Sequence, residues 1–207
     1  MKINLKVTLL INVLVLFLTQ LIFIPGPSVL FRPANWIFNA AQLASIAGIL
    51  LTLILIVWLL VERFAFKKSK QRILNSFGFL ILTLCISTFL STTYISSFTS
   101  DLSRNLAIRE ANLLIHKIED YKLANGTYPH EIEELNTEIP NPSPIGIKKF
   151  HYERTEQSYK LTFQQNVIMG FNFEVVTYDP NNQHTTRGEM PTLYDTPYQN
   201  WKYYIYD

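Results

Sequence analysis

The sequence predicts an α-helical membrane anchor of three transmembrane helices, followed by an α+β domain in which a long helix packs on a small antiparallel sheet. Three observations predict this fold class. Three uncharged apolar runs lie in the first half of the 207 residues, an apolar stripe at helical spacing follows them, and short segments of alternating polarity come after the stripe. We place the membrane domain at residues 1–98 and the outer domain at residues 99–207.

The three transmembrane helices are expected at about residues 7–24, 41–61 and 77–95. A helix needs about 20 apolar residues to cross the hydrocarbon core of a bilayer, and each run is long enough. A cleaved signal peptide is the alternative interpretation of residues 1–24. We favour a retained helix, because its apolar core is long for a signal and no A-x-A-like cleavage site follows it.

The distribution of charge predicts the orientation. Residues 1–98 carry eight Lys or Arg and one acid, whereas residues 99–207 carry ten bases and fifteen acids. Within the first half, the loop 62–76 has five bases and the loop 25–40 has only Arg32. Because cytoplasmic loops are enriched in Lys and Arg, we expect the N-terminus inside and the C-terminal domain outside the cytoplasm.

Polar side chains within the spans are few and uncharged. The spans contain no Asp, Glu, Lys, Arg or His, which argues against a transporter or pump. We expect the hydroxyls of Thr83, Ser87 and Ser91 to bond to the carbonyls of their own helix. Bonds to a neighbouring helix are the alternative. The single cysteine, Cys85, excludes an intramolecular disulfide and a CxxC metal site.

The third span is predicted to continue into the outer domain as one helix, from about Phe77 to Ala124. No glycine or proline interrupts residues 79–125. Serine and threonine are frequent from Ser91 to Ser100, and this hydroxyl-rich stretch makes a bend near Ser96–Ser97 the expected weak point of the helix. Asn125–Gly126 ends the helix, since glycine suits the left-handed cap. The helix carries an apolar stripe made of Ala107, Ala111, Leu114, Ile118 and Tyr121.

The remaining residues predict a sheet that covers this stripe. A short helical turn is expected at residues 131–135, followed by irregular chain around Pro140, Pro142 and Pro144. Alternating polarity then predicts antiparallel strands with a hairpin turn at residues 154–157. The four strand candidates are Lys149–Glu153, Ser158–Gln164, Phe171–Tyr178 and Trp201–Tyr206.

The end of the long helix resembles the type IV pilin-like superfamily, and the major pseudopilin of type II secretion in particular. The resemblance rests on residues 118–129, Ile-Glu-Asp-Tyr-Lys-Leu-Ala-Asn-Gly-Thr-Tyr-Pro, and extends over about residues 77–207. It implies a pilin-like fold for the outer domain and a place in the cytoplasmic (inner) membrane of a bacterium. Two spans precede the match, and Thr83 stands where a prepilin has its glutamate, so the resemblance does not imply cleavage or filament assembly.

We assign no catalytic, cofactor-binding or metal-binding residue from the sequence. The resemblance implies a calcium loop in the region of Asp179, Asn181, Asn182, Glu189 and Asp195, but Asp-Pro-Asn-Asn is also an ordinary turn sequence. The four histidines lack the spacing of metal ligands. A cluster of three glutamates is better explained as a solvated surface. A glycosylation sequon that overlaps the predicted helix end is better explained as the helix stop. These groups are His116, His130, His151 and His184; Glu131, Glu133 and Glu134; and Asn125–Thr127.

These observations lead to one expected function and two alternatives. We expect a non-enzymatic membrane protein whose tyrosine-rich outer domain contacts other membrane or envelope proteins in a secretion or envelope assembly. Its other partner is the lipid bilayer, and no nucleic acid is expected. One alternative is a membrane-anchored sensor or binding module for calcium or a small ligand. The other, an enzyme, is disfavoured because no nucleophile–base set is visible.

Overall fold

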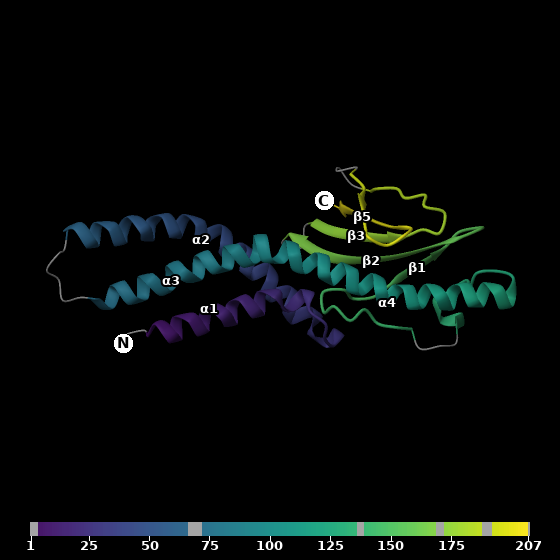
Figure 1. Ribbon diagram of the computed structural model, residues 1–207, viewed down its shortest axis with the longest axis horizontal. Coiled ribbons are helices and arrows are strands. Elements are labelled where there is room, and N and C mark those ends of the chain that lie inside the picture. Colours follow the sequence, from purple (N-terminus) through teal and green to yellow (C-terminus); the bar gives the residue numbers. More distant parts are fainter. Residues whose placement is uncertain (1–3, 66–71, 136–138, 169–171, 188–191, 207) are drawn as a thin grey trace. The chain divides into compact units, whose positions relative to one another are not determined.

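The computed structural model describes residues 4–65, 72–135, 139–168, 172–187 and 192–206. The chain forms two compact units. The first comprises residues 1–21 and 36–98, and the second comprises residues 22–35 and 99–207. The second unit therefore contains a segment, residues 22–35, that lies within the sequence of the membrane anchor. Figure 1 shows the order of the elements along the chain.

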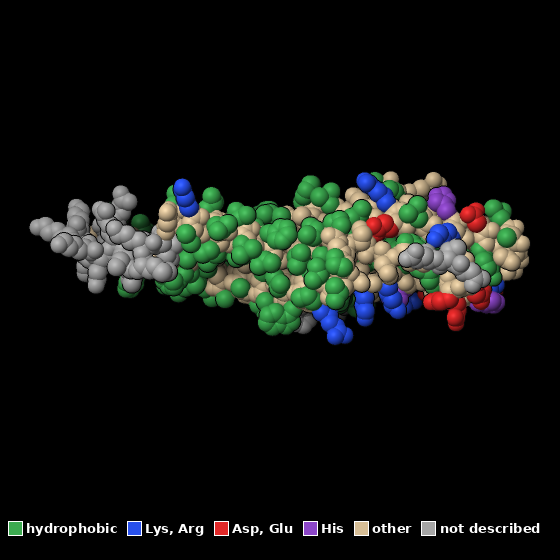
Figure 2. Space-filling view, turned by 90° about the horizontal axis from the view of Figure 1, so that it is seen from below, with side chains coloured by type: hydrophobic (Ala, Val, Ile, Leu, Met, Phe, Trp, Pro, Cys, Tyr) green, Lys and Arg blue, Asp and Glu red, His purple; other side chains and the backbone are tan. Residues whose placement is uncertain are grey.

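The first unit is built from three long helices, as predicted. Helix α1 spans Leu5–Gln20, α2 spans Phe31–Ala65 and α3 spans Arg72–Leu90. Within the described residues, three helices are long and apolar enough to cross a membrane. Many large hydrophobic side chains of these helices are exposed, and hydrophobic side chains cover much of the face seen in Figure 2, as contact with the hydrocarbon of a bilayer requires. The centre of the basic loop, residues 66–71, lies outside the described residues.

Helix α3 packs closely on α2. A Cβ atom added to Gly48 of α2 would lie 3.4 Å from the Cβ of Cys85, which is ordinary van der Waals contact. Small residues let membrane helices approach in this way, because lipid provides no hydrophobic force to hold them together.

The predicted helical continuity holds, with one irregularity. After α3 the chain passes directly through a π-helical segment, η3 (Ser91–Ile95), into α4 (Ser96–Asn125). The irregularity falls just before the expected weak point. The Ser96 hydroxyl donates a 2.6 Å hydrogen bond to the carbonyl oxygen of Thr92, a side-chain bond that competes with the regular backbone pattern. Gly126, at φ +78°, ends α4 as predicted.

The second unit contains a five-stranded antiparallel sheet in the order β1-β2-β3-β5-β4. Three of the four expected strands are close to their predicted bounds, and β2 runs four residues further than expected. The additional strand, β4, has only two residues. The five strands are β1 (His151–Arg154), β2 (Tyr159–Ile168), β3 (Asn172–Tyr178), β4 (Tyr194–Asp195) and β5 (Trp201–Tyr206).

The apolar stripe of α4 packs on one face of this sheet. Ala107, Ala111, Leu114 and Ile118 are fully buried, as predicted. They share one core with Leu161, Phe163, Val176 and Trp201 of the sheet. The indole nitrogen of Trp201 donates a 2.9 Å hydrogen bond to Asn112 Oδ1 of α4, which satisfies the buried N–H. The predicted helical turn is a 3₁₀ segment, η4 (Ile132–Leu135).

The segment between the first two spans is part of this domain. Pro25 and Pro144 lie opposite one another in an isolated antiparallel bridge. The flanking amides carry the hydrogen bonds: Gly26 N–H donates to Ser143 O at 2.8 Å, and Ile145 N–H donates to Ile24 O at 3.0 Å. This is the non-hydrogen-bonded position of an antiparallel ladder, which needs no N–H group from the central residue. Two prolines therefore fit there without loss of a hydrogen bond.

Candidate functional site: a polar groove on the sheet

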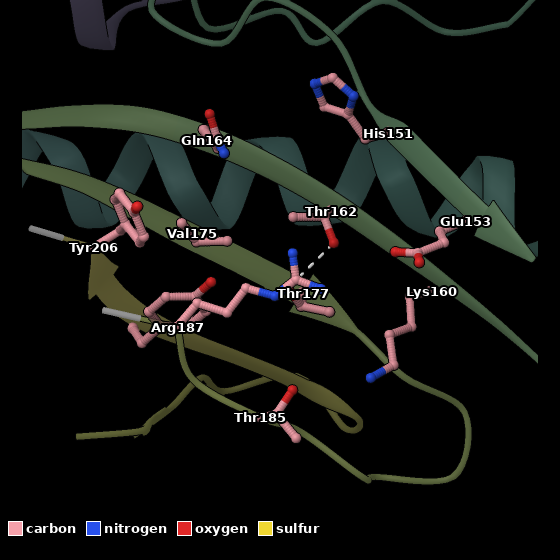
Figure 3. A pocket seen from close by; sticks show the side chains of 11 residues that line it. His151, Glu153, Lys160, Thr162, Gln164, Val175, Thr177, Thr185, Arg187 and Tyr206 are labelled. Atoms are coloured by element: carbon pink, nitrogen blue, oxygen red, sulfur yellow. Dashed lines mark hydrogen bonds between the residues drawn. The ribbon is translucent and has the colours of Figure 1, made fainter. Parts of the chain in front are cut away.

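The two faces of the sheet differ in chemistry, because successive side chains along a strand alternate between faces. Leu161 and Phe163 of β2 point into the core, whereas Thr162 and Gln164 point to the opposite face. A groove of about 500 Å³ lies on that opposite face (Figure 3). We call it the sheet groove. It is lined by His151, Glu153, Lys160, Thr162, Gln164, Val175, Thr177, Thr185, Arg187, Tyr204 and Tyr206.

The floor of the groove is held by strand pairing. Thr162 and Thr177 are partners in the β2–β3 register, and their hydroxyl oxygens lie 3.2 Å apart. Val175 and Tyr204 are partners in the β3–β5 register, and both side chains are 7 % exposed. One end of the floor is therefore polar and the other apolar. Tyr204 and Tyr206 face the groove while Trp201 enters the core, so β5 carries aromatics on both faces.

A loop, residues 179–187, runs along the groove and contributes Thr185 and Arg187 to its wall (Figure 3). We call this loop the strap. Its first residue, Asp179, is buried, and its carboxylate lies 3.4 Å from Lys160 Nζ. Lys160 also donates a 3.3 Å hydrogen bond to the carbonyl oxygen of Gln183. One lysine of the sheet thus fixes the strap at two points.

The same contacts bear on the calcium loop implied by the resemblance. Both Asp179 oxygens contact protein groups, because Oδ1 accepts a 2.9 Å hydrogen bond from the amide of Asn181 and Oδ2 faces Lys160. Asp195 is exposed and pairs with Lys202 at 3.1 Å, and Glu189 lies outside the described residues. Among the residues that the structure describes, no three His, Cys, Asp or Glu are grouped to hold a metal ion.

Two histidines of the sheet groove and its strap have lowered pKa values. Burial is the largest cause that lowers the pKa of His151, and the charges of Lys149 and Lys148 lower it further. These two lysines precede β1 in the sequence. Burial also lowers the pKa of His184 in the strap, against the opposing effect of Asp179. Both histidines therefore favour the neutral form.

A second polar cluster joins the beginning of α4 to the sheet. Arg104 Nε lies 3.0 Å from Glu174 Oε1 of β3, without the alignment of a hydrogen bond, and both side chains are buried. Arg104 also pairs with Asp101, and its guanidinium lies 3.9 Å from the ring centroid of Tyr203. Burial raises the pKa of Glu174 to about 7, and the nearby Arg104 only partly offsets this effect.

A third polar contact lies in the first unit, between α1 and α3–η3. The amide nitrogen of Asn12 donates a 3.1 Å hydrogen bond to Thr83, and its oxygen accepts one of 2.6 Å from Ser87. Gln20 Nε2 lies 2.9 Å from the carbonyl oxygen of Ser91 and 2.8 Å from its hydroxyl. Thr83 and Ser87 bond to their own helix, as we expected, but they also bond across to α1, so both interpretations apply.

Sequence reasoning missed Asn12 and Gln20 because it weighed only ionisable groups and hydroxyls. A usable signal was present. The two amides are eight residues apart in a run whose only other polar residues are Thr8 and Thr19, and eight residues is the spacing of one helix stripe. Amide side chains within a span need a partner, since lipid offers none.

The other residues singled out in the sequence have structural environments. Glu134 accepts hydrogen bonds from the amide of His130 at 3.0 Å and from the hydroxyl of Tyr121 at 3.1 Å. These bonds, the first more than the second, lower the pKa of its carboxyl group. His116 and His130 are exposed, and only His151 lines the groove. Asn125 donates a 2.9 Å hydrogen bond to the carbonyl oxygen of Tyr121, in keeping with its role at the helix end.

Comparison of the chain with protein-family models, with curated proteins and with solved structures gives no match. The functional argument therefore rests on the geometry of the molecule. The sheet groove offers hydroxyl, amide and guanidinium groups beside an apolar end, which is the composition of a binding site for a polar ligand.

Proposed function

We propose that this chain is a non-enzymatic protein of the bacterial inner membrane whose extracytoplasmic, pilin-like domain contacts other proteins of a secretion or envelope assembly. One observation carries the proposal: the face of α4 turned away from the sheet presents large apolar side chains to solvent. Leu102, Leu113 and Leu123 are 53 %, 60 % and 85 % exposed. Apolar residues exposed along one helix are typical of a surface that contacts another protein.

The spacing of these leucines favours an apolar helix as the partner element. Leu102 and Leu113 are eleven residues apart, which is close to three helical turns and places them on the same stripe. The exposed Arg109 and His116 lie between and beside them, so the face is mixed rather than purely apolar. A helix that presents an apolar face to such a stripe buries the leucines and leaves the polar groups at the rim.

The second unit supports the proposed topology. Residues 22–35 follow the first span and residues 99–207 follow the third, yet both belong to one compact unit. A folded unit occupies one side of a membrane, so the chain between them crosses the bilayer an even number of times. Spans α2 and α3 supply two crossings. With the basic loop inside, as the distribution of charge predicts, we expect the domain outside the cytoplasm.

Site-specific photo-crosslinking tests the contact. A photoreactive residue is placed at Leu113 in the full chain in its native membrane, with Thr155 of the hairpin turn as the matched exposed control. We expect a discrete crosslinked product from position 113 that is absent at position 155 and is reduced by Leu102→Asp. Equal crosslinking at both positions, or none at position 113, would contradict the proposal.

A binding module is the second candidate function, and the sheet groove is the observation that favours it. The groove lies on the face of the sheet opposite α4, so a ligand there would not compete with a partner on the leucine stripe. Enzymatic activity is not part of either proposal.

A further inference from the structure

We propose that the sheet groove binds a small organic anion, whose carboxylate or phosphate group is held by Arg187 and by the hydroxyls of Thr162, Thr177 and Thr185. This inference does not depend on the proposed protein contact. It rests on the charge of the groove, on its volume and polarity, and on the way the strap is held.

The charge of the groove runs against that of the domain. Residues 99–207 carry fifteen acids and ten bases, but the groove lining has two cations, Lys160 and Arg187, against one acid, Glu153. Lys160 is already engaged by Asp179. Arg187 is exposed, and no carboxylate among the described residues lies within ion-pair distance of it. Figure 3 shows its side chain extending toward Thr177, over the floor of the groove.

The donors suit an oxyanion with further polar groups. A guanidinium presents a planar fork that matches two oxygens of a carboxylate or phosphate. Thr162 and Thr177 line the same groove as Arg187. Their hydroxyls are 3.2 Å apart, so one can donate to the other while the second remains free to donate to a ligand. A volume of about 500 Å³ exceeds that of a single inorganic ion and suits a small organic molecule.

The strap makes binding selective for a ligand that bridges two elements. Arg187 and Thr185 come from the strap, whereas Thr162 and Thr177 come from β2 and β3. The strap is already fixed by Asp179 and Lys160 at its first residues. The strap is thus held before a ligand binds, which reduces the entropic cost of binding.

Calorimetric titration of the purified full chain in nanodiscs tests the inference. The probes are citrate and inorganic phosphate in phosphatidylcholine nanodiscs, and a third arm compares the phosphate titration in phosphatidylglycerol nanodiscs. The variants are Arg187→Gln and, as a matched loss of one exposed positive charge in the same unit, Arg32→Gln. Thermal unfolding of each variant is recorded to establish that the domain remains folded.

We expect citrate to bind the wild type more tightly than phosphate, because citrate offers several carboxylates and hydroxyl contacts. Arg187→Gln should raise the Kd by about 10- to 100-fold, since a charge-assisted hydrogen bond is lost, and Arg32→Gln should change it less than about 2-fold. If phosphate binds more weakly in phosphatidylglycerol than in phosphatidylcholine nanodiscs, the anionic lipid headgroup competes with phosphate for the groove, and the headgroup is then the source of the bound anion. Absence of binding by both probes, or equal effects of the two variants, would overturn the inference while leaving the crosslinking result unaffected.

Discussion

The amide of Gly146 donates a 2.6 Å hydrogen bond to the carbonyl oxygen of Ile22. Ile22 lies two residues beyond the end of α1, and Gly146 lies in the proline-rich segment that precedes the sheet. A Cβ atom added to Gly146 would lie 2.6 Å from that same oxygen, so the approach requires glycine. Ile22 and Ile145 are both buried beside it. The segment that links the first two long helices is thus built into the second unit by backbone contacts.

Gly146→Ala should destabilise the second unit by about 1–3 kcal/mol, because neither backbone can yield easily to the added methyl group. Gly26→Ala should cost less, since its Cβ would meet the end of the flexible Ile145 side chain. Thermal unfolding of the full chain in detergent, followed by tryptophan fluorescence, measures both. Gly48→Ala in α2 is the control, where the new contact is ordinary. A Gly146→Ala protein with the same unfolding temperature as the wild type would show that the Gly146–Ile22 contact has room for a methyl group.

Glu174 should make the stability of the second unit depend on pH. Its pKa of about 7 in the folded state lies above the ordinary value of 4.5, so its stabilising contribution is fully present below about pH 4.5 and is lost as pH rises through 7. The loss is on the order of 3 kcal/mol. Glu174→Gln should therefore flatten the stability profile between pH 5 and 8 relative to the wild type, measured by urea unfolding.

Two histidines change the stability of the second unit with pH in the direction opposite to Glu174. The Glu174→Gln variant is therefore compared with the wild type at each pH. The lowered pKa values of His151 and His184 reduce stability as pH falls, in an overlapping range. The difference between the two proteins isolates the contribution of Glu174. A difference that stays constant from pH 5 to 8 would contradict its raised pKa.

The amides of α1 should hold that helix against α3 and η3. Asn12→Leu removes two cross-helix hydrogen bonds but leaves Thr83 and Ser87 bonded to their own carbonyls. Gln20→Leu removes two bonds to Ser91 at a buried position. We expect each to lower stability in detergent by about 0.5–2 kcal/mol. Leu10→Asn, on an exposed position of α1, is the control for a polar change in the same helix. Unchanged stability in both leucine variants would remove the proposed role of the amides.

Calcium should leave the thermal unfolding temperature of the full chain unchanged. The carboxylate of Asp179 already accepts the Asn181 amide and faces Lys160, so a cation would have to displace a lysine charge. A calorimetric titration with calcium, with magnesium as the comparison, checks this. A saturable heat specific to calcium would restore the metal site implied by the pilin-like resemblance.

The elements with a regular period were predictable from the sequence. The α4 stripe from Ala107 to Ile118 repeats at three- and four-residue steps, and β2 alternates between apolar and polar residues from Tyr159 to Gln164, so each pattern reports which face is buried. Strand β4, Tyr194–Asp195, is too short to show any period. The π-helical segment fell within the hydroxyl-rich stretch, although the expected bend was placed a few residues later.

The parts that escaped prediction depend on contacts between distant segments. The Pro25–Pro144 bridge uses backbone groups, which leave no periodic side-chain pattern in either segment. The sheet groove gathers residues from four strands and the strap, and only the strand order brings His151 and Tyr206 into one lining. Thr162 and Thr177 looked like ordinary polar positions of half-buried strands until their register placed them opposite one another.

Disulfide formation between Pro25→Cys and Pro144→Cys, in a Cys85→Ala background, tests the central claim that the segment 22–35 is part of an outer domain. Non-hydrogen-bonded antiparallel partners have Cα atoms about 4.5 Å apart, which a disulfide can span. We predict rapid crosslinking in intact cells under mild oxidation, labelling of the reduced pair by a membrane-impermeant maleimide, and no crosslink in the control pair Pro25→Cys with Thr155→Cys. Failure of the first pair to crosslink, or labelling only after the membrane is permeabilised, would contradict the account.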